Sequence, residues 1–103
     1  MIRISVEEHN GSICSLEITG HSGSAERGKD LVCAAVSGIA FGLCNAMDIL
    51  AHAEDISVGD NLISIKVSQP DEQTDLILKT GLIQLETVAE QNRRFIKVYK
   101  LEV

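Results

Sequence analysis

The stretch from Leu31 to about Ala51 constrains the fold more than any other part of the sequence. Asp30, a residue type that caps helices well, precedes it, and apolar residues then occur on nearly every side of the predicted helix. A helix that is apolar all round has to be covered on more than one side. A sheet covers one side. The other is covered by a second subunit, or the short side chains simply permit close packing. The stretch therefore predicts a core helix and favours a homodimer.

Before this helix, the alternating segment “IRISV” predicts a half-buried strand. The Asn10-Gly11 pair that follows predicts a hairpin turn, because both residues tolerate positive φ. In the return strand “ICSLEITG”, the same alternation places Cys14 on the buried face. The chain is thus expected to begin with a β-hairpin.

After the helix, “DISVGDNLISIKVS” predicts a second hairpin that turns at residues 59–61. Pro70 and two acidic residues then begin a second helix, where a proline and negative charge suit the first turn. “RFIKVYKLEV” closes the chain as a strand. The order ββαββαβ predicts one α+β domain over residues 1–103, a mixed or antiparallel sheet with two helices packed on it. The expected inward residues are Ile63, Ile65 and Val67 of the hairpin and Leu78, Leu82, Leu85 and Ala89 of the second helix.

Cysteine usage and charge exclude several classes of function. Cys14, Cys33 and Cys44 form no CxxC pair and no zinc-ligand spacing, so we expect reduced thiols, no metal site and no cofactor. A net charge of −6 argues against nucleic-acid binding and favours a basic protein or peptide as partner. The N-terminus resembles no signal peptide, and Ser37, Asn45 and Asp48 interrupt the longest apolar run. We therefore expect a cytoplasmic protein that does not enter the membrane.

Cys33 is the residue with the clearest chemical potential. It falls at the third position of the predicted helix, where unpaired N–H groups and the helix dipole favour a thiolate, although a close Asp30 carboxylate would oppose one. Twelve positions before it lies His21, across a small polar loop, near enough in sequence to act as a base. The alternatives are structural: a core cysteine, a histidine at a strand end, and a Ser37 hydroxyl bonded to the preceding turn. Cys44 is expected in the core, and His9 and His52 at the surface.

The stretch “GHSGSAERGKDLVCAAVS”, continued by “FGLCNA”, resembles the ribosomal-processing cysteine protease family, whose pattern is GH…G.D.VCAA.S. The resemblance covers essentially the whole chain. It implies that Cys33 is the nucleophile, that His21 is its base, and that Asp30 and Ser37 support the site. Asp30 would orient His21, cap the helix, or do both. The implied substrate is the N-terminal extension of large-subunit ribosomal protein twenty-seven, cut after a short apolar motif ending in phenylalanine during ribosome maturation, by a homodimer.

The loop between the two catalytic candidates has the composition of a mobile lid, which we expect to become ordered when the peptide binds. Its residues are Ser22, Gly23, Ser24, Ala25, Glu26, Arg27, Gly28 and Lys29. N–H groups at the helix start, around Cys33, are expected to stabilise the oxyanion. Two other readings compete with the protease: a non-catalytic binding module for ribosome assembly, and a thiol redox enzyme centred on Cys33.

Overall fold

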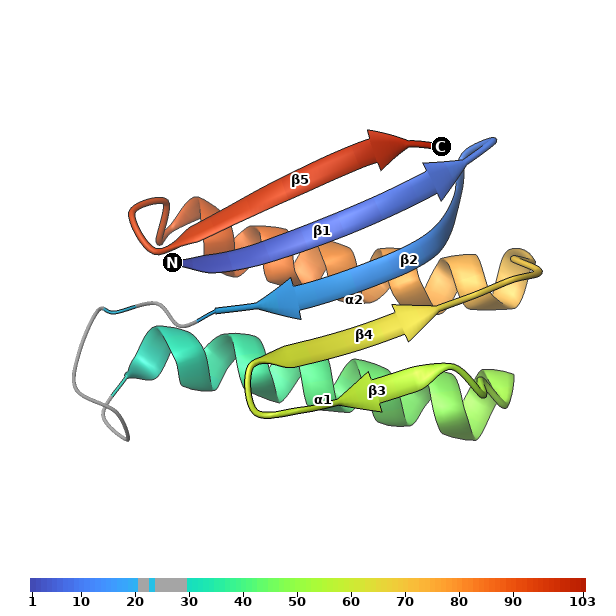
Figure 1. Ribbon diagram of the computed structural model, residues 1–103, viewed down its shortest axis with the longest axis horizontal. Coiled ribbons are helices and arrows are strands. Elements are labelled where there is room, and N and C mark those ends of the chain that lie inside the picture. The colour runs from blue at the N-terminus through green and yellow to red at the C-terminus, as the bar shows by residue number, and fades with distance from the viewer. Residues whose placement is uncertain (21–22, 24–29) are drawn as a thin grey trace.

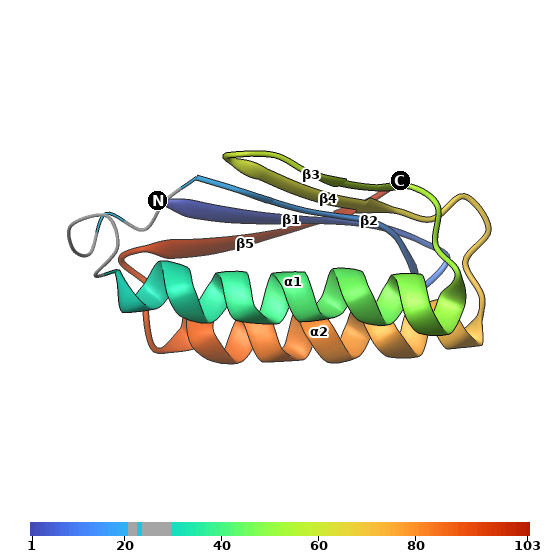
Figure 2. The ribbon, with the colours of Figure 1, turned by 90° about the horizontal axis from the view of Figure 1, so that it is seen from below.

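The computed structural model describes residues 1–20, 23 and 30–103 of the chain. Their elements follow the order ββαββαβ, which confirms the expected α+β fold. Both helices cover one face of a twisted sheet and leave the other face open (Figures 1 and 2). The elements are β1 (Ile2–His9), β2 (Ser12–Thr19), α1 (Leu31–Ala51), β3 (Ile56–Val58), β4 (Leu62–Lys66), α2 (Glu72–Glu90) and β5 (Ile96–Glu102).

The sheet has the strand order β3-β4-β2-β1-β5. Its neighbours are antiparallel except for β5, which returns from α2 to run parallel to β1 (Figure 1). The two hairpins therefore meet in the middle of the sheet, where β2 pairs with β4. This pairing brings the β3–β4 turn to the same end of the molecule as the start of α1 (Figure 1).

The helices begin and end where their flanking residues satisfy the orphan backbone groups. The side chain of Asp71 accepts the Thr74 N–H at 2.8 Å, and the Thr74 hydroxyl accepts the Asp71 N–H at 3.0 Å, which forms a capping box for α2. At the end of α1, His52 adopts a left-handed conformation with φ 53° and donates its N–H to the carbonyl of Asp48. The bounds of both helices thus follow from local capping.

The core lies between the helices and the covered face of the sheet. Ile63 and Ile65 are buried, Val67 is half-buried against the core, and the predicted stripe of α2 is buried throughout. The two helices approach closely at Gly81, where a Cβ would lie 2.6 Å from a methyl group of Leu43. The inward pattern expected for these two elements is confirmed.

The expectation for Cys14 is wrong, because a β-bulge changes the register of the first hairpin. Glu7 pairs with Ser15 while Glu8 pairs with Ile13, so Cys14 is the extra residue. Ile13 takes the buried position, its N–H and the Ser12 hydroxyl both donating to the carboxylate of Asp75 in α2. Cys14 is left half-exposed.

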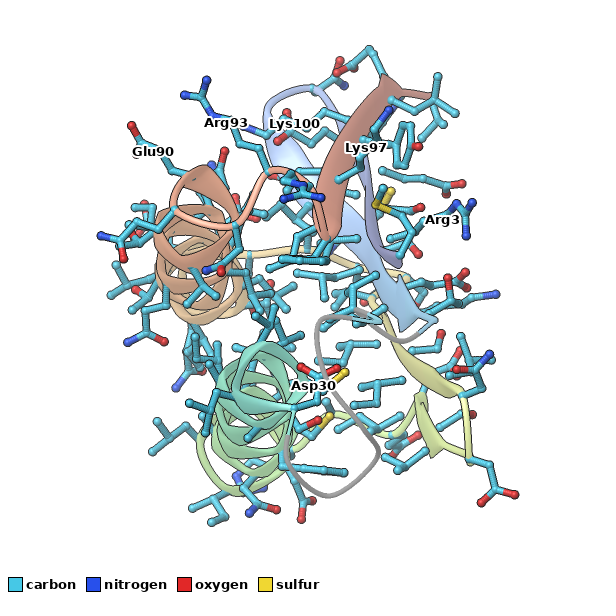
Figure 3. All side chains as sticks on the ribbon, turned by 90° about the vertical axis from the view of Figure 1, so that its left-hand side faces the viewer. Arg3, Asp30, Glu90, Arg93, Lys97 and Lys100 are labelled. Carbon is cyan, nitrogen blue, oxygen red and sulfur yellow. The ribbon has the colours of Figure 1, made fainter. Side chains whose placement is uncertain are left out.

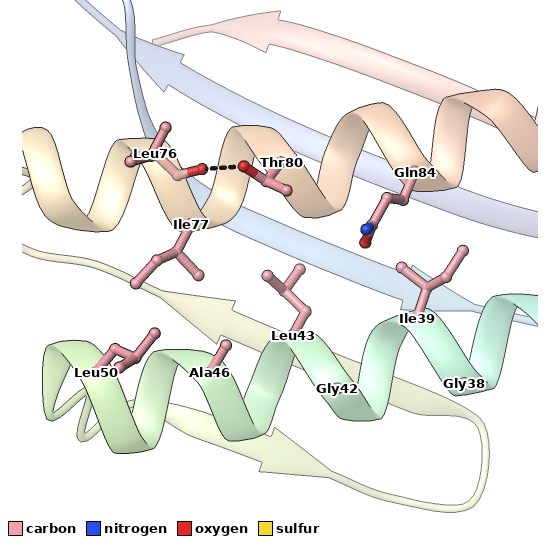
Figure 4. Close-up of a pocket in the computed structure, with 10 residues that line it drawn as sticks. All are labelled: Gly38, Ile39, Gly42, Leu43, Ala46, Leu50, Leu76, Ile77, Thr80 and Gln84. Atoms are coloured by element: carbon pink, nitrogen blue, oxygen red, sulfur yellow. Dashed lines mark hydrogen bonds between the residues drawn. The ribbon is translucent and has the colours of Figure 1, made fainter.

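The helix α1 is covered on only one side in the single chain. Five of its residues are buried, whereas Leu31 is 81% and Ile49 is 69% exposed. The helix α1 is long and apolar enough to cross a membrane, but core helices meet the same criteria of length and hydropathy. On its uncovered side it forms a groove of about 700 Å³ with α2, where Gly38, Gly42 and Ala46 are the small residues that α1 contributes (Figure 4).

Candidate active site

The candidate nucleophile Cys33 lies in the first turn of α1, half-buried, at the end of the molecule that Figure 3 faces. Its N–H donates to Oδ1 of Asp30 at 3.0 Å. The carbonyl of Asp30 accepts the N–H of Ala34 at 3.0 Å, so the helical hydrogen bonds begin there. This geometry confirms that Asp30 is the N-cap and that Cys33 is the third helical residue.

The capping bond changes which N–H groups can stabilise an oxyanion. The N–H of Cys33 already donates to the carboxylate of Asp30. While this bond is formed, the Cys33 N–H does not donate to an oxyanion. A helix start leaves its first N–H groups without helical acceptors, and here these belong to Leu31 and Val32. The N–H groups expected to stabilise an oxyanion are therefore those of Leu31 and Val32, the two residues before Cys33.

Cys33 lies on a small cavity of about 120 Å³ between α1 and the sheet. Ser37, one turn further along α1, lines the same cavity. The remaining lining residues are Ile2, Ile18, Gly20, Val36, Phe41, Gly59, Asp60, Asn61, Leu62 and Ile63. Most of these side chains are aliphatic or aromatic, so the space next to the thiol suits an apolar group.

Sequence reasoning found the helix side of this cavity and missed the rest. The β3–β4 turn, residues 59–62, reaches Cys33 only because β4 pairs with β2. Phe41 could have been found, since it lies two helical turns beyond Cys33 on the same side of α1. Ile2 and Ile18, as alternating strand residues, carry no signal that separates them from other core positions.

Gly20 ends the described part of the chain after β2, and no other residue type would fit there. Its φ is +88°, a region that side chains disfavour, and a Cβ would collide with the carbonyl oxygen of Met1. This glycine lets the chain pass close to the N-terminus and lines the cavity of Cys33. It therefore fixes the direction in which the chain leaves β2.

The partner expected for Cys33 lies outside the described residues. His21, and Ser22 and residues 24–29 of the predicted lid, are not among them. Gly23 is described, exposed and at a positive φ of 70°. The pairing of His21 with Cys33 and the behaviour of the loop thus stay predictions.

The other cysteines and histidines lie away from this cavity. Cys44 is buried in α1, and burial raises the pKa of its thiol. The Cys14 thiol donates to the carbonyl of Glu7 at 3.4 Å, and His9 and His52 are at the surface. Within residues 1–20, 23 and 30–103, no cluster of three or more His, Cys, Asp or Glu side chains could hold a metal ion.

The net negative charge is unevenly distributed over the described residues. From Asp30 to Ile65 the chain has five acidic residues and no lysine or arginine. Arg3 pairs across the sheet with Lys97, and Arg93 and Lys100 lie on the other side of β5 (Figure 3). Among the described residues, the segment from the start of α1 to Ile65 therefore has acidic side chains that no lysine or arginine of the same segment offsets.

Comparison with known proteins identifies the family of the chain. The family model for cysteine protease Prp matches residues 1–97. The chain belongs to the Prp family of cysteine proteases. It is 31% identical to the ribosomal processing cysteine protease Prp of Bacillus subtilis, over 87% of this chain and 88% of that protein. It is 35% identical to the ribosomal processing cysteine protease Prp of Mycoplasma pneumoniae, over 93% of this chain and 91% of that protein.

The fold agrees with a solved Prp structure as well. The crystal structure of the essential ribosomal processing protease Prp from S. aureus, in complex with a covalently linked product peptide, superposes with a TM-score of 0.90. The two chains are 30% identical, and the superposition covers 97% of this chain and 99% of the S. aureus chain. Membership of the Prp family thus rests on sequence and fold together.

Proposed function

We propose that this protein is a cysteine endopeptidase that removes the N-terminal extension of large-subunit ribosomal protein twenty-seven, with Cys33 as the nucleophile. The observation that carries the proposal is the position of Cys33, at the capped start of α1 and on the rim of an apolar cavity. Family membership supports processing of a ribosomal protein, since the relatives are ribosomal processing proteases.

The cavity beside Cys33 supports cleavage after an apolar residue. Its volume is about 120 Å³, and an apolar cavity of about 150 Å³ in another protein holds benzene. A single phenyl ring therefore matches the size of this partly open cavity. A phenylalanine immediately before the scissile bond would place its ring there and its carbonyl next to the thiol.

The proposed reaction passes through an acyl-enzyme. The Cys33 thiolate attacks the carbonyl carbon of the peptide, and His21 as imidazolium protonates the leaving amine. Neutral His21 then takes a proton from water, which attacks the thioester, releases the acid and restores the Cys33 thiolate and the His21 imidazolium. The N–H groups of Leu31 and Val32 are the proposed oxyanion donors, and one such donor contributes about 10²–10³ in kcat. The S. aureus Prp holds a covalently linked product peptide, which supports covalent chemistry.

The decisive experiment follows the products of an extended ribosomal-protein N-terminus by mass spectrometry, with the wild type, Cys33→Ala and the matched control Cys14→Ala, at a half-exposed cysteine that lines neither space along α1. We expect one cut by the wild type and by Cys14→Ala, and none by Cys33→Ala. An intact peptide with all three proteins, across several apolar motifs, would refute the protease and favour the assembly module. Rapid and reversible sulfenic acid formation at Cys33, coupled to peroxide turnover, would favour the redox enzyme.

We also propose that the protein works as a cytoplasmic homodimer joined through the helix face. Two copies that each carry a net charge of −6 repel one another, so they meet most favourably on an uncharged surface. The groove between α1 and α2 is such a surface, lined by ten residues without a charge (Figure 4). Ala46→Glu should shift the mass measured by light scattering from dimer to monomer, while Gln91→Glu should not. A monomeric wild type would refute the dimer.

A further inference from the structure

A second hollow continues the cavity of Cys33 along α1. It has a volume of about 290 Å³ and lies between α1 and the short edge strand β3. Phe41 lines both spaces, so the two are neighbours on one side of the helix. The other residues that line the second hollow are Cys44, Asn45, Asp48, Ala53, Ile56 and Val58.

The strand β3 offers backbone groups to this hollow. The N–H of Gly59 donates to Leu62 at 2.8 Å, and the carbonyl of Asp55 accepts the N–H of Lys66 at 3.0 Å, so both residues point toward β4. Alternate residues of an antiparallel strand point to opposite sides. Ile56 and Val58 therefore direct their N–H and C=O groups away from β4, toward the outer edge of the sheet. No described strand pairs with that edge.

The acidic residues around the hollow indicate which kind of ligand the hollow binds. Asp48 is exposed and lines the hollow, and Asp60 is exposed beside the cavity of Cys33. The described residues that line the two spaces include no lysine or arginine. An extended peptide with apolar side chains and a basic residue matches an apolar groove with an acidic rim.

We propose that the substrate continues from the scissile bond at Cys33 along this groove as an added strand on β3, with a basic side chain next to Asp48. The proposal rests on the proposed protease function and names how the same site selects its substrate. The helix α1 rises about 1.5 Å per residue, so Asn45 is about 18 Å and Asp48 about 22 Å from Cys33. An extended peptide covers these distances with about five and seven residues.

The length of the peptide gives the first test. Peptides that extend eight residues on both sides of the cut are shortened from each end in turn, and kcat/KM is measured. Shortening one end to three residues should lower kcat/KM about tenfold or more, the loss expected when several backbone hydrogen bonds disappear. Equal kcat/KM for all lengths would overturn the groove. An absence of cleavage even of the longest peptide would instead refute the proposed function.

Charge exchange gives the second test. Asp48→Lys should lower kcat/KM about threefold or more for a peptide with lysine near the seventh position from the cut. Glutamate at that position should restore the rate of this variant. Glu54→Lys is the matched control, because it makes the same change of charge on a residue that does not line the hollow. Equal losses in both variants, or no rescue by glutamate, would overturn the contact.

Backbone methylation of the peptide tests the added strand itself. Only every second N–H of an added strand faces β3, so methylation at successive positions should raise KM with a period of two residues. A three-residue peptide arm that ends before the hollow should be cut equally by the wild type and by Asp48→Lys, which shows that the Cys33 site is intact. Uniform sensitivity to methylation would refute pairing with β3.

Discussion

Replacing Asp30 with alanine removes the N-cap of α1 and tests how the site is held. The bond from the Cys33 N–H to Oδ1, at 3.0 Å and half-buried, is the one that disappears. Loss of an N-cap side chain costs about 0.5–2 kcal/mol, typically about 1 kcal/mol. For a domain of about 100 residues this corresponds to a fall in Tm of about 4–8 °C. Asp30→Asn keeps a side-chain oxygen at the same place, so its Tm should fall far less.

The start of α2 supplies the matched control. Asp71 caps that helix through Thr74 with equivalent geometry, at the opposite end of the molecule from Cys33 (Figure 1). Asp71→Ala should therefore lower Tm by a similar amount and leave kcat/KM unchanged at temperatures where it is folded. Asp30→Ala should lower both quantities, because the first turn that carries Cys33 frays.

Calorimetry and cleavage kinetics on the same samples decide the outcome. If Asp30→Asn unfolds at as low a temperature as Asp30→Ala, the cap is not what Asp30 contributes and the reasoning is refuted. If Asp30→Asn keeps its Tm but loses kcat, the carboxylate acts on His21 in addition to capping the helix. The two roles that the sequence left open are thereby separated.

Three further predictions concern a glycine, the core and the thiols. Gly20→Ala should destabilise the protein more than Gly11→Ala by differential calorimetry, because both have positive φ but only the Cβ at Gly20 meets a backbone carbonyl; equal losses would contradict the collision. Leu78→Ala, at a fully buried position, should cost about 2–5 kcal/mol in urea unfolding, and a loss below about 1 kcal/mol would show that the core collapses around it. Iodoacetamide should label Cys33 before Cys44, because burial raises the pKa of the Cys44 thiol and keeps it protonated until the pH rises further; mass spectrometry that finds Cys44 labelled first would refute this order.

The sequence by itself determined the elements and the position of the candidate nucleophile, Cys33, on its helix. Asp30 before an apolar run, and Asn10-Gly11 between two alternating segments, act through hydrogen bonds that span only a few residues. All residues that take part in such a hydrogen bond lie within one short segment of the sequence. The order ββαββαβ and the third helical position of Cys33 were therefore predictable, and both agree with the structure.

Only the tertiary structure decided what surrounds Cys33 and which residues the first hairpin buries. The β3–β4 turn and Ile2 reach the cavity because β4 pairs with β2 and β2 with β1, pairings between segments far apart in the chain. The bulge that exposes Cys14 follows the hydrogen bonds of Ile13 and Ser12 to Asp75, more than 60 residues away. Alternation within one strand gives no information about such partners. Their positions depend on the packing of the whole domain.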